Sequence, residues 1–210
     1  MTFSIFAARA AIGAAALALI ALAALHILKP EIHPSRAMIS QYALGRHGWV
    51  MALCFAMFAA ASACLFVALA PQLQSLPSRI GLGFLLSAAL GLAMAARFPM
   101  DPVATPSRQM SFSGRMHGVS FLIGVPSQTI AVLLVSLGIG SETSQSSLLL
   151  LALTSIIWLS LILMMAIMSM AGHGKTANPD GPQRYLGWPN RLFMVSYGLW
   201  LLVAAWRMAW

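Results

Sequence analysis

Residues 147–171 read SLLLLALTSIIWLSLILMMAIMSMA, a run of 25 residues without a charged side chain. A helix needs about 20 predominantly apolar residues to cross the hydrocarbon core of a bilayer, which is about 30 Å thick. The strands of a transmembrane barrel would alternate apolar and polar residues, and the runs Leu148–Leu151 and Leu161–Met165 do not alternate. This segment therefore predicts a membrane-spanning α-helix.

Five more segments meet the same requirement. The chain is 60% hydrophobic and 8% charged, whereas a typical soluble domain is about 25% charged. We therefore expect an all-α fold, a polytopic membrane bundle of six transmembrane helices without a soluble domain. The first segment is longer than the apolar part of a signal peptide and has no cluster of positive charge before it, so we interpret it as a true span. The expected spans, which form one domain over residues 1–210, are 5–28, 49–70, 80–96, 117–139, 147–171 and 192–210.

The connections between these segments alternate between long and short. Those after the first, third and fifth segments lie at about 29–48, 98–116 and 172–191. With the residues that border them, they hold 9 of the 12 Lys and Arg, 3 of the 4 acidic residues and 4 of the 5 His. Because consecutive spans cross the membrane in opposite directions, the three long loops lie on one side. We expect the chemistry of the protein on that side.

Positive charge also predicts the orientation of the chain. Nine Lys and Arg accompany the long loops, against three on the other side, namely Arg9, Arg79 and Arg207. An excess of Lys and Arg marks cytoplasmic loops, so we expect the long loops in the cytoplasm. Since the net charge of +8 sits at membrane boundaries, it indicates contact with membrane lipids and not with nucleic acid.

Asp101 and His117 are the candidate catalytic residues. Asp101 lies between Pro99 and Pro102, which stiffen the backbone just past an expected helix end. His117 opens the fourth expected span on the same side of the membrane. In one interpretation Asp101 pairs with Arg97 or caps a turn. In the other it meets His117 in a polar pocket, where His117 acts as a general base that Asp101 orients.

The other candidates would hold a ligand at the same face. Arginine suits bidentate binding of carboxylate or phosphate, although topology and contact with lipid headgroups explain arginines at a membrane boundary equally well. In the fourth span, Pro126 should kink the helix. Gln128 lies about 16 Å below His117 at 1.5 Å per residue, so it requires either an interhelical partner or a cavity. The candidate ligand-binding residues are Arg36, Ser40, His47, Arg108, Gln128 and Arg191.

The histidines raise the question of a metal or a haem. His33, His47 and His117 together with Asp101 would be enough ligands for zinc, but no two of them show the close spacing of a metal-binding motif. A haem between His47 and His117 is an alternative, because both residues begin helices at a similar depth. We predict no metal site, and the sequence identifies no cofactor.

An ordered set of motifs covers nearly the whole chain. They are Pro34-Ser35-Arg36-x-x-Ile39-Ser40, then Phe98-Pro99-Met100-Asp101-Pro102, then His117 opening a span, then Gly187-x-x-x-Arg191 before a last helix that contains Trp200. In these motifs the chain resembles the DUF998 family, small bacterial and archaeal integral membrane proteins with about six helices and no established general activity. The resemblance implies a six-helix fold, a candidate site and a location in the bacterial inner membrane, but it supplies no function.

Two positions depart from the family pattern. Gln41 stands where the family often has an acidic residue, and Met100 stands where it often has a cysteine before the aspartate. The absence of the acid weakens any metal-binding or acid–base role for the first of these positions.

The convergence of Arg36, Ser40, Asp101, His117 and Arg191 at one membrane boundary predicts a pocket that binds or processes a lipid or another anionic amphiphile. Whether the protein is an enzyme stays open, because the chain contains no nucleophile motif. A non-catalytic subunit that binds other membrane-protein subunits is one alternative, in keeping with the small size and the bulky apolar fifth segment. A small transporter and a haem-binding membrane protein are the others.

Overall fold

The computed structural model describes residues 2–103, 105–139, 145–172 and 185–210. These residues form six long α-helices, each long and apolar enough to cross a membrane, and two short 3-10 helices, with no strand among them. The all-α six-span fold expected from the sequence is thus confirmed. In chain order the elements are α1 (Thr2–Leu28), η1 (Ile39–Ala43), α2 (Gly48–Leu69), α3 (Leu76–Arg97), η2 (Ser107–Gln109), α4 (Phe112–Ile139), α5 (Gln145–Gly172) and α6 (Gly187–Ala209).

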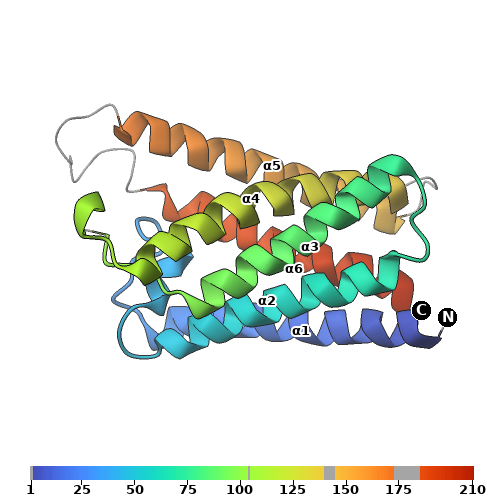
Figure 1. Ribbon diagram of the computed structural model, residues 1–210, viewed down its shortest axis with the longest axis horizontal. Coiled ribbons are helices and arrows are strands. Elements are labelled where there is room, and N and C mark those ends of the chain that lie inside the picture. Colours follow the sequence, from blue (N-terminus) through green and yellow to red (C-terminus); the bar gives the residue numbers. More distant parts are fainter. Residues whose placement is uncertain (1, 104, 140–144, 173–184) are drawn as a thin grey trace.

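Figure 1 shows the six helices running along the long axis of the molecule, with both termini at one end. The segments that join α1 to α2 and α3 to α4 lie at the opposite end, together with the last turns of α5 and the first turns of α6. The short connection between α2 and α3 lies at the end of the termini. This is the arrangement that the alternating connections predict. The end with the long connections is called the long-loop face below.

Several helices begin earlier than the apolar pattern indicates, because polar residues start them. The third begins at Leu76 and not at residue 80, after Ser75, whose hydroxyl accepts a hydrogen bond from the backbone of Ser78 at 3.3 Å. The fourth begins at Phe112 and not at residue 117, and the sixth at Gly187 and not at residue 192. His117 therefore lies in the second turn of α4 and does not open it.

Small residues bring α3 and α4 into close contact. A Cβ atom added to Gly91 would lie 2.6 Å from the Cα atom of Gly124, and one added to Gly81 would lie 2.8 Å from the Cβ atom of Leu134. Without a hydrophobic force between helices in lipid, such close backbone approach is a main source of helix association. The narrow α3–α4 seam positions one wall of the site described below.

Buried polar pairs tie α6 to its neighbours inside the bundle. The indole Nε1 of Trp200 donates to the Ser136 hydroxyl at 2.8 Å, and that hydroxyl lies 3.0 Å from the hydroxyl of Thr154. Ser62 and Tyr197 share a hydrogen bond of 2.7 Å between α2 and α6. These polar groups are satisfied by one another, so they serve helix packing.

Candidate functional site

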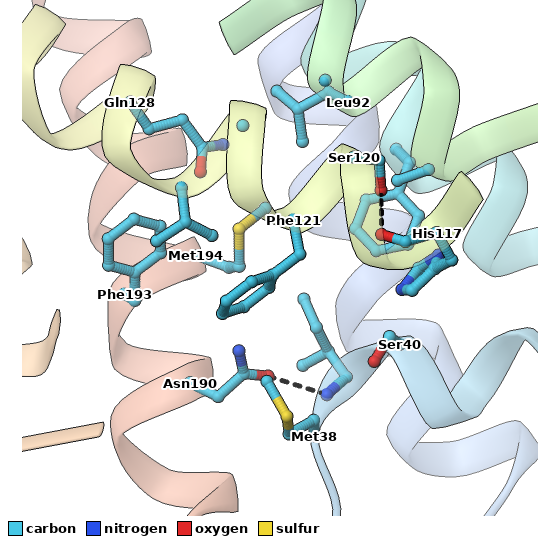
Figure 2. A pocket seen from close by; sticks show the side chains of 16 residues that line it. Met38, Ser40, Leu92, His117, Ser120, Phe121, Gln128, Asn190, Phe193 and Met194 are labelled. Carbon is cyan, nitrogen blue, oxygen red and sulfur yellow. Dashed lines mark hydrogen bonds between the residues drawn. The ribbon is translucent and has the colours of Figure 1, made fainter. Parts of the chain in front are cut away.

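A cavity lies near the long-loop face, between α2, α3, α4, α6 and the η1 segment (Figure 2). The cavity has a volume of about 60 Å³, which is enough for a few water molecules or a short part of a larger ligand. Its walls are mainly apolar, as in most sites for small organic molecules. The apolar side chains come from Met38, Ile39, Phe55, Leu92, Ala95, Phe121, Val125, Phe193 and Met194.

One face of α4 supplies the polar side of the cavity. His117, Ser120, Gly124 and Gln128 all line it, at spacings of three and four residues. Residues at this spacing share a helix face, so the stripe runs along α4 from the long-loop face toward the middle of the span. Eleven residues separate His117 from Gln128, which corresponds to about 16 Å along the helix axis at 1.5 Å per residue.

The imidazole of His117 is held in a defined orientation by the end of α3. Its Nδ1 atom lies 2.9 Å from the backbone carbonyl oxygen of Phe98. A carbonyl can only accept, so Nδ1 carries the hydrogen and Nε2 of the neutral ring is left as an acceptor. Among the described residues, no group donates a hydrogen bond to this Nε2 atom. His117 can therefore accept a hydrogen bond from a ligand.

Asp101 has a structural task at the start of α4. Its carboxylate accepts hydrogen bonds from the backbone N–H and the hydroxyl of Ser111, both at 2.7 Å, and the Ser111 hydroxyl accepts the N–H of Gly114 at 3.0 Å. A negative group at a helix N-terminus satisfies free N–H groups and complements the helix dipole. Of the two interpretations of Asp101, the capped turn is the one this geometry shows. No hydrogen bond joins Asp101 to His117.

Arg191 is buried, with 6% of its surface exposed, and its donors are directed at the first loop. Its Nη1 atom donates to the carbonyl oxygens of Pro34 and Ala37, both at 2.6 Å, and its Nη2 atom donates to the Tyr42 hydroxyl at 3.1 Å. Its Nε atom donates to Nε2 of His26 at 2.9 Å. The guanidinium thus fastens the first loop to α6, and it does not line the cavity.

Two further residues in this region were not singled out as site residues in the sequence. Nδ1 of His26 donates to the carbonyl of Leu22 at 2.8 Å, so His26 is a neutral ring that accepts from Arg191. Lys29 is 4% exposed, and its ammonium group donates to the carbonyls of Tyr42, at 3.2 Å, and of Leu44. The signal available in the sequence was a histidine and a lysine inside or beside an apolar helix end, where only buried acceptors would satisfy them.

Asn190 is a cavity residue that sequence reasoning missed. Its side-chain oxygen accepts a hydrogen bond from the backbone N–H of Ile39 at 2.8 Å, which holds the start of η1 against α6 (Figure 2). An amide directly before Arg191, at the start of an apolar span, is the feature that points to a buried polar contact.

The remaining candidates divide between the cavity and the surface. Ser40 is half-buried and lines the cavity, and no hydrogen bond from another described residue reaches its hydroxyl. Arg36 and Arg108 are exposed at the long-loop face, and His47 precedes α2 with a φ of 63°. None of these three lines the cavity. The structure therefore brings together Ser40, His117 and Gln128 and separates them from the other candidates.

Potential metal ligands do not gather in the part of the chain that the structure describes. No group of three or more His, Cys, Asp or Glu that could hold a metal ion occurs among these residues.

Residues 12–207 match the family model described as "Protein of unknown function (DUF998)". No curated protein matches the chain. No solved structure matches it either.

Proposed function

The chain belongs to the DUF998 family, and we propose that it binds a lipid or another amphiphile, a short part of which enters the cavity beside α4. The observation that carries the proposal is the composition of this cavity. Its walls are apolar, yet the side chains of Ser40, His117 and Gln128 present polar atoms to it that no described residue satisfies. An apolar site with a few convergent polar groups is typical of ligand pockets.

The direction of the cavity suits a lipid that stands in the bilayer. Ser40 and His117 lie near the long-loop face, and Gln128 lies deeper in the span of α4. A polar headgroup would bind near the first two residues, and a hydrocarbon chain would run between Phe121, Val125 and the facing helices. At the head, the free Nε2 atom of His117 favours a ligand group that donates a hydrogen bond, such as a hydroxyl.

Exposed arginines at the long-loop face support an anionic headgroup. The side chains of Arg36, Arg46, Arg108 and Arg115 are exposed there. Each Lys or Arg near a membrane surface attracts anionic lipid by about 1 kcal/mol. Arg191 does not take part, because its guanidinium already binds three backbone carbonyls, a phenol and an imidazole.

Binding is the part of the sequence-based expectation that the geometry favours over processing of the ligand. The mechanism expected from the sequence needs the Asp101 carboxylate to orient His117 as a general base. This carboxylate is instead engaged with Ser111, and the backbone carbonyl of Phe98 holds the imidazole. A neutral, oriented imidazole in an apolar cavity is well suited to recognise a hydroxyl.

Filling the cavity tests the proposal. Ala95 lines the cavity and Ala93, on the same helix, is exposed, so Ala95→Leu and Ala93→Leu form a matched pair. The probe is a fluorescent polyene fatty acid, titrated into the protein in a neutral detergent. Because a leucine at position 95 would occupy space that the ligand needs, we expect Ala95→Leu to weaken binding of the probe by about tenfold or more, which is about 1.4 kcal/mol, and Ala93→Leu to leave it unchanged.

A second cavity-filling variant keeps the test valid if Ala95→Leu does not fold. Val125→Phe enters the same cavity from α4. Each variant is first checked for a single symmetrical peak in size-exclusion chromatography. If both folded variants bind the probe as the wild type does, or if the wild type does not bind it, the proposed function is wrong.

A further inference from the structure

The structure points to a more specific class of ligand, and we infer that the lipid of this cavity carries a hydrogen-bond-accepting oxygen within its apolar part, at the depth of Gln128. A keto lipid and a quinone share this chemistry, whereas a plain acyl chain lacks it. The inference rests on the proposed function, because it concerns the same cavity.

Gln128 is an amide that the protein leaves unsatisfied. Its side chain is 1% exposed, it lines the cavity, and its Nε2 atom has no hydrogen-bond partner among the described residues. Figure 2 shows its amide end turned toward the cavity from α4. An unpaired buried donor is costly, so its presence beside a cavity calls for an explanation such as a ligand.

Other polar side chains of the same helix show that α4 can satisfy such groups when no ligand is needed. The Thr129 hydroxyl donates to the carbonyl of Val125 at 2.8 Å, and Ser136 accepts from Trp200. Within the described residues, the two other unsatisfied buried side-chain atoms belong to Trp158 and Ser160. Neither lines this cavity. Ser160 lines a separate apolar groove with Leu163 and Trp188. Gln128 is thus the described residue whose orphaned donor belongs to the cavity beside α4.

The chemistry of the orphaned atom selects the ligand. An amide N–H donates, so its partner must accept, as a ketone or quinone carbonyl does. A water molecule beside the amide would satisfy it, but a plain hydrocarbon chain that displaces this water leaves the amide unpaired. A site with a buried donor discriminates strongly against a ligand that lacks the acceptor.

A matched pair of ligands tests this inference. The probes are stearate and a stearate that carries one mid-chain keto group, each competed against the fluorescent fatty acid bound to the wild-type protein. We expect the keto probe to bind about tenfold more tightly, which is about 1.4 kcal/mol. In Gln128→Met, which keeps an unbranched side chain of similar length, this preference should vanish while stearate binds as well as before.

The control and a second readout separate selectivity from general damage. Gln109→Met removes an exposed glutamine at the long-loop face, and it should keep the keto preference. In the infrared spectrum, the carbonyl stretch of the bound keto probe should lie at lower frequency in the wild type than in Gln128→Met. If Gln128→Met does not fold, Gln128→Asn shortens the amide and should reduce the preference in the same way.

The outcomes distinguish this inference from the proposed function. If stearate and the keto probe bind the wild type equally, the inference is overturned and the proposed function stands. A preference that survives in Gln128→Met also overturns the inference. If neither probe displaces the fluorescent fatty acid, both are wrong.

Discussion

At the scale of single residues, Arg191 shows how the same side chain can serve a ligand or the fold. The sequence places it in a loop with other basic residues at a membrane boundary, which suggests an anion site. In the folded protein, the Nε, Nη1 and Nη2 atoms of Arg191 all donate hydrogen bonds to protein groups. The acceptors are His26, Tyr42 and the carbonyls of Pro34, Ala37 and Gly187. Such contacts demand the planar fork of a guanidinium, which an ammonium group cannot replace.

We therefore expect Arg191→Lys to destabilise the protein although the charge is kept. The lysine leaves several carbonyl groups of the first loop unpaired, and a buried acceptor left without its hydrogen bond costs about 1–3 kcal/mol. The matched control is Arg36→Lys, since Arg36 is exposed and its guanidinium makes no described hydrogen bond. Thermal unfolding in detergent measures the difference. Equal melting temperatures for the two variants would contradict a structural role for Arg191.

At the scale of elements, the start of α4 depends on a contact between a loop carboxylate and a glycine. Asp101 lies against the first turn of α4, and a Cβ atom at Gly114 would collide with its carboxylate. The Asp101 carboxylate fits against α4 only because residue 114 is a glycine, so the effects of substitutions at positions 101 and 114 should be coupled. The cap also fixes the register of α4, and with it the depth of His117.

A double-mutant cycle measures this coupling. Asp101→Ala should lower stability by about 1 kcal/mol through loss of the cap. Gly114→Ala alone should cost about 1–3 kcal/mol through overpacking, but on the Asp101→Ala background it should cost nothing further, because the colliding atoms are gone. Chemical or thermal unfolding of the four proteins gives the cycle. Strictly additive losses would show that the two residues do not act as one unit.

Some parts of the site and of the helices could be predicted from the sequence, and others could not. Ser40, His117 and Gln128 were found because they are polar residues at a membrane boundary or inside a span, where an unsatisfied group is expensive. The predicted starts of α3, α4 and α6 lie four or five residues after the observed ones, because the first turn of a helix is often polar and an apolar pattern omits it. The partners of Arg191 could not be found, since Ala37 is 154 positions away in the chain and only the folded bundle brings them together.

For the molecule as a whole, the long loops keep an excess of Lys and Arg over the other end even when the buried basic residues are left out of the count. Of the nine Lys and Arg that the sequence assigns to the long loops and their borders, Lys29 and Arg191 are buried, with 4% and 6% of their surfaces exposed. Both side chains bind protein carbonyls, so their positions are explained by the fold and do not indicate on which side of the membrane the loops lie. Removing these two from the nine leaves seven, against three at the other end. The exposed tryptophans at both ends, among them Trp49 and Trp206, fit the two interfaces of a bilayer.

The remaining excess of seven over three predicts that the long-loop face lies in the cytoplasm. Glu31→Cys places a thiol at this face and Gln72→Cys places one at the other end, and both native residues are exposed. In intact bacteria a membrane-impermeant maleimide should label Gln72→Cys, and it should label Glu31→Cys only after the cells are permeabilised. Because the native Cys54 is buried and Cys64 is half-buried within α2, the unsubstituted protein is the control for background labelling. The reverse pattern would place the cavity mouth, with Ser40 and His117, on the outer side, where a headgroup would enter from the other leaflet.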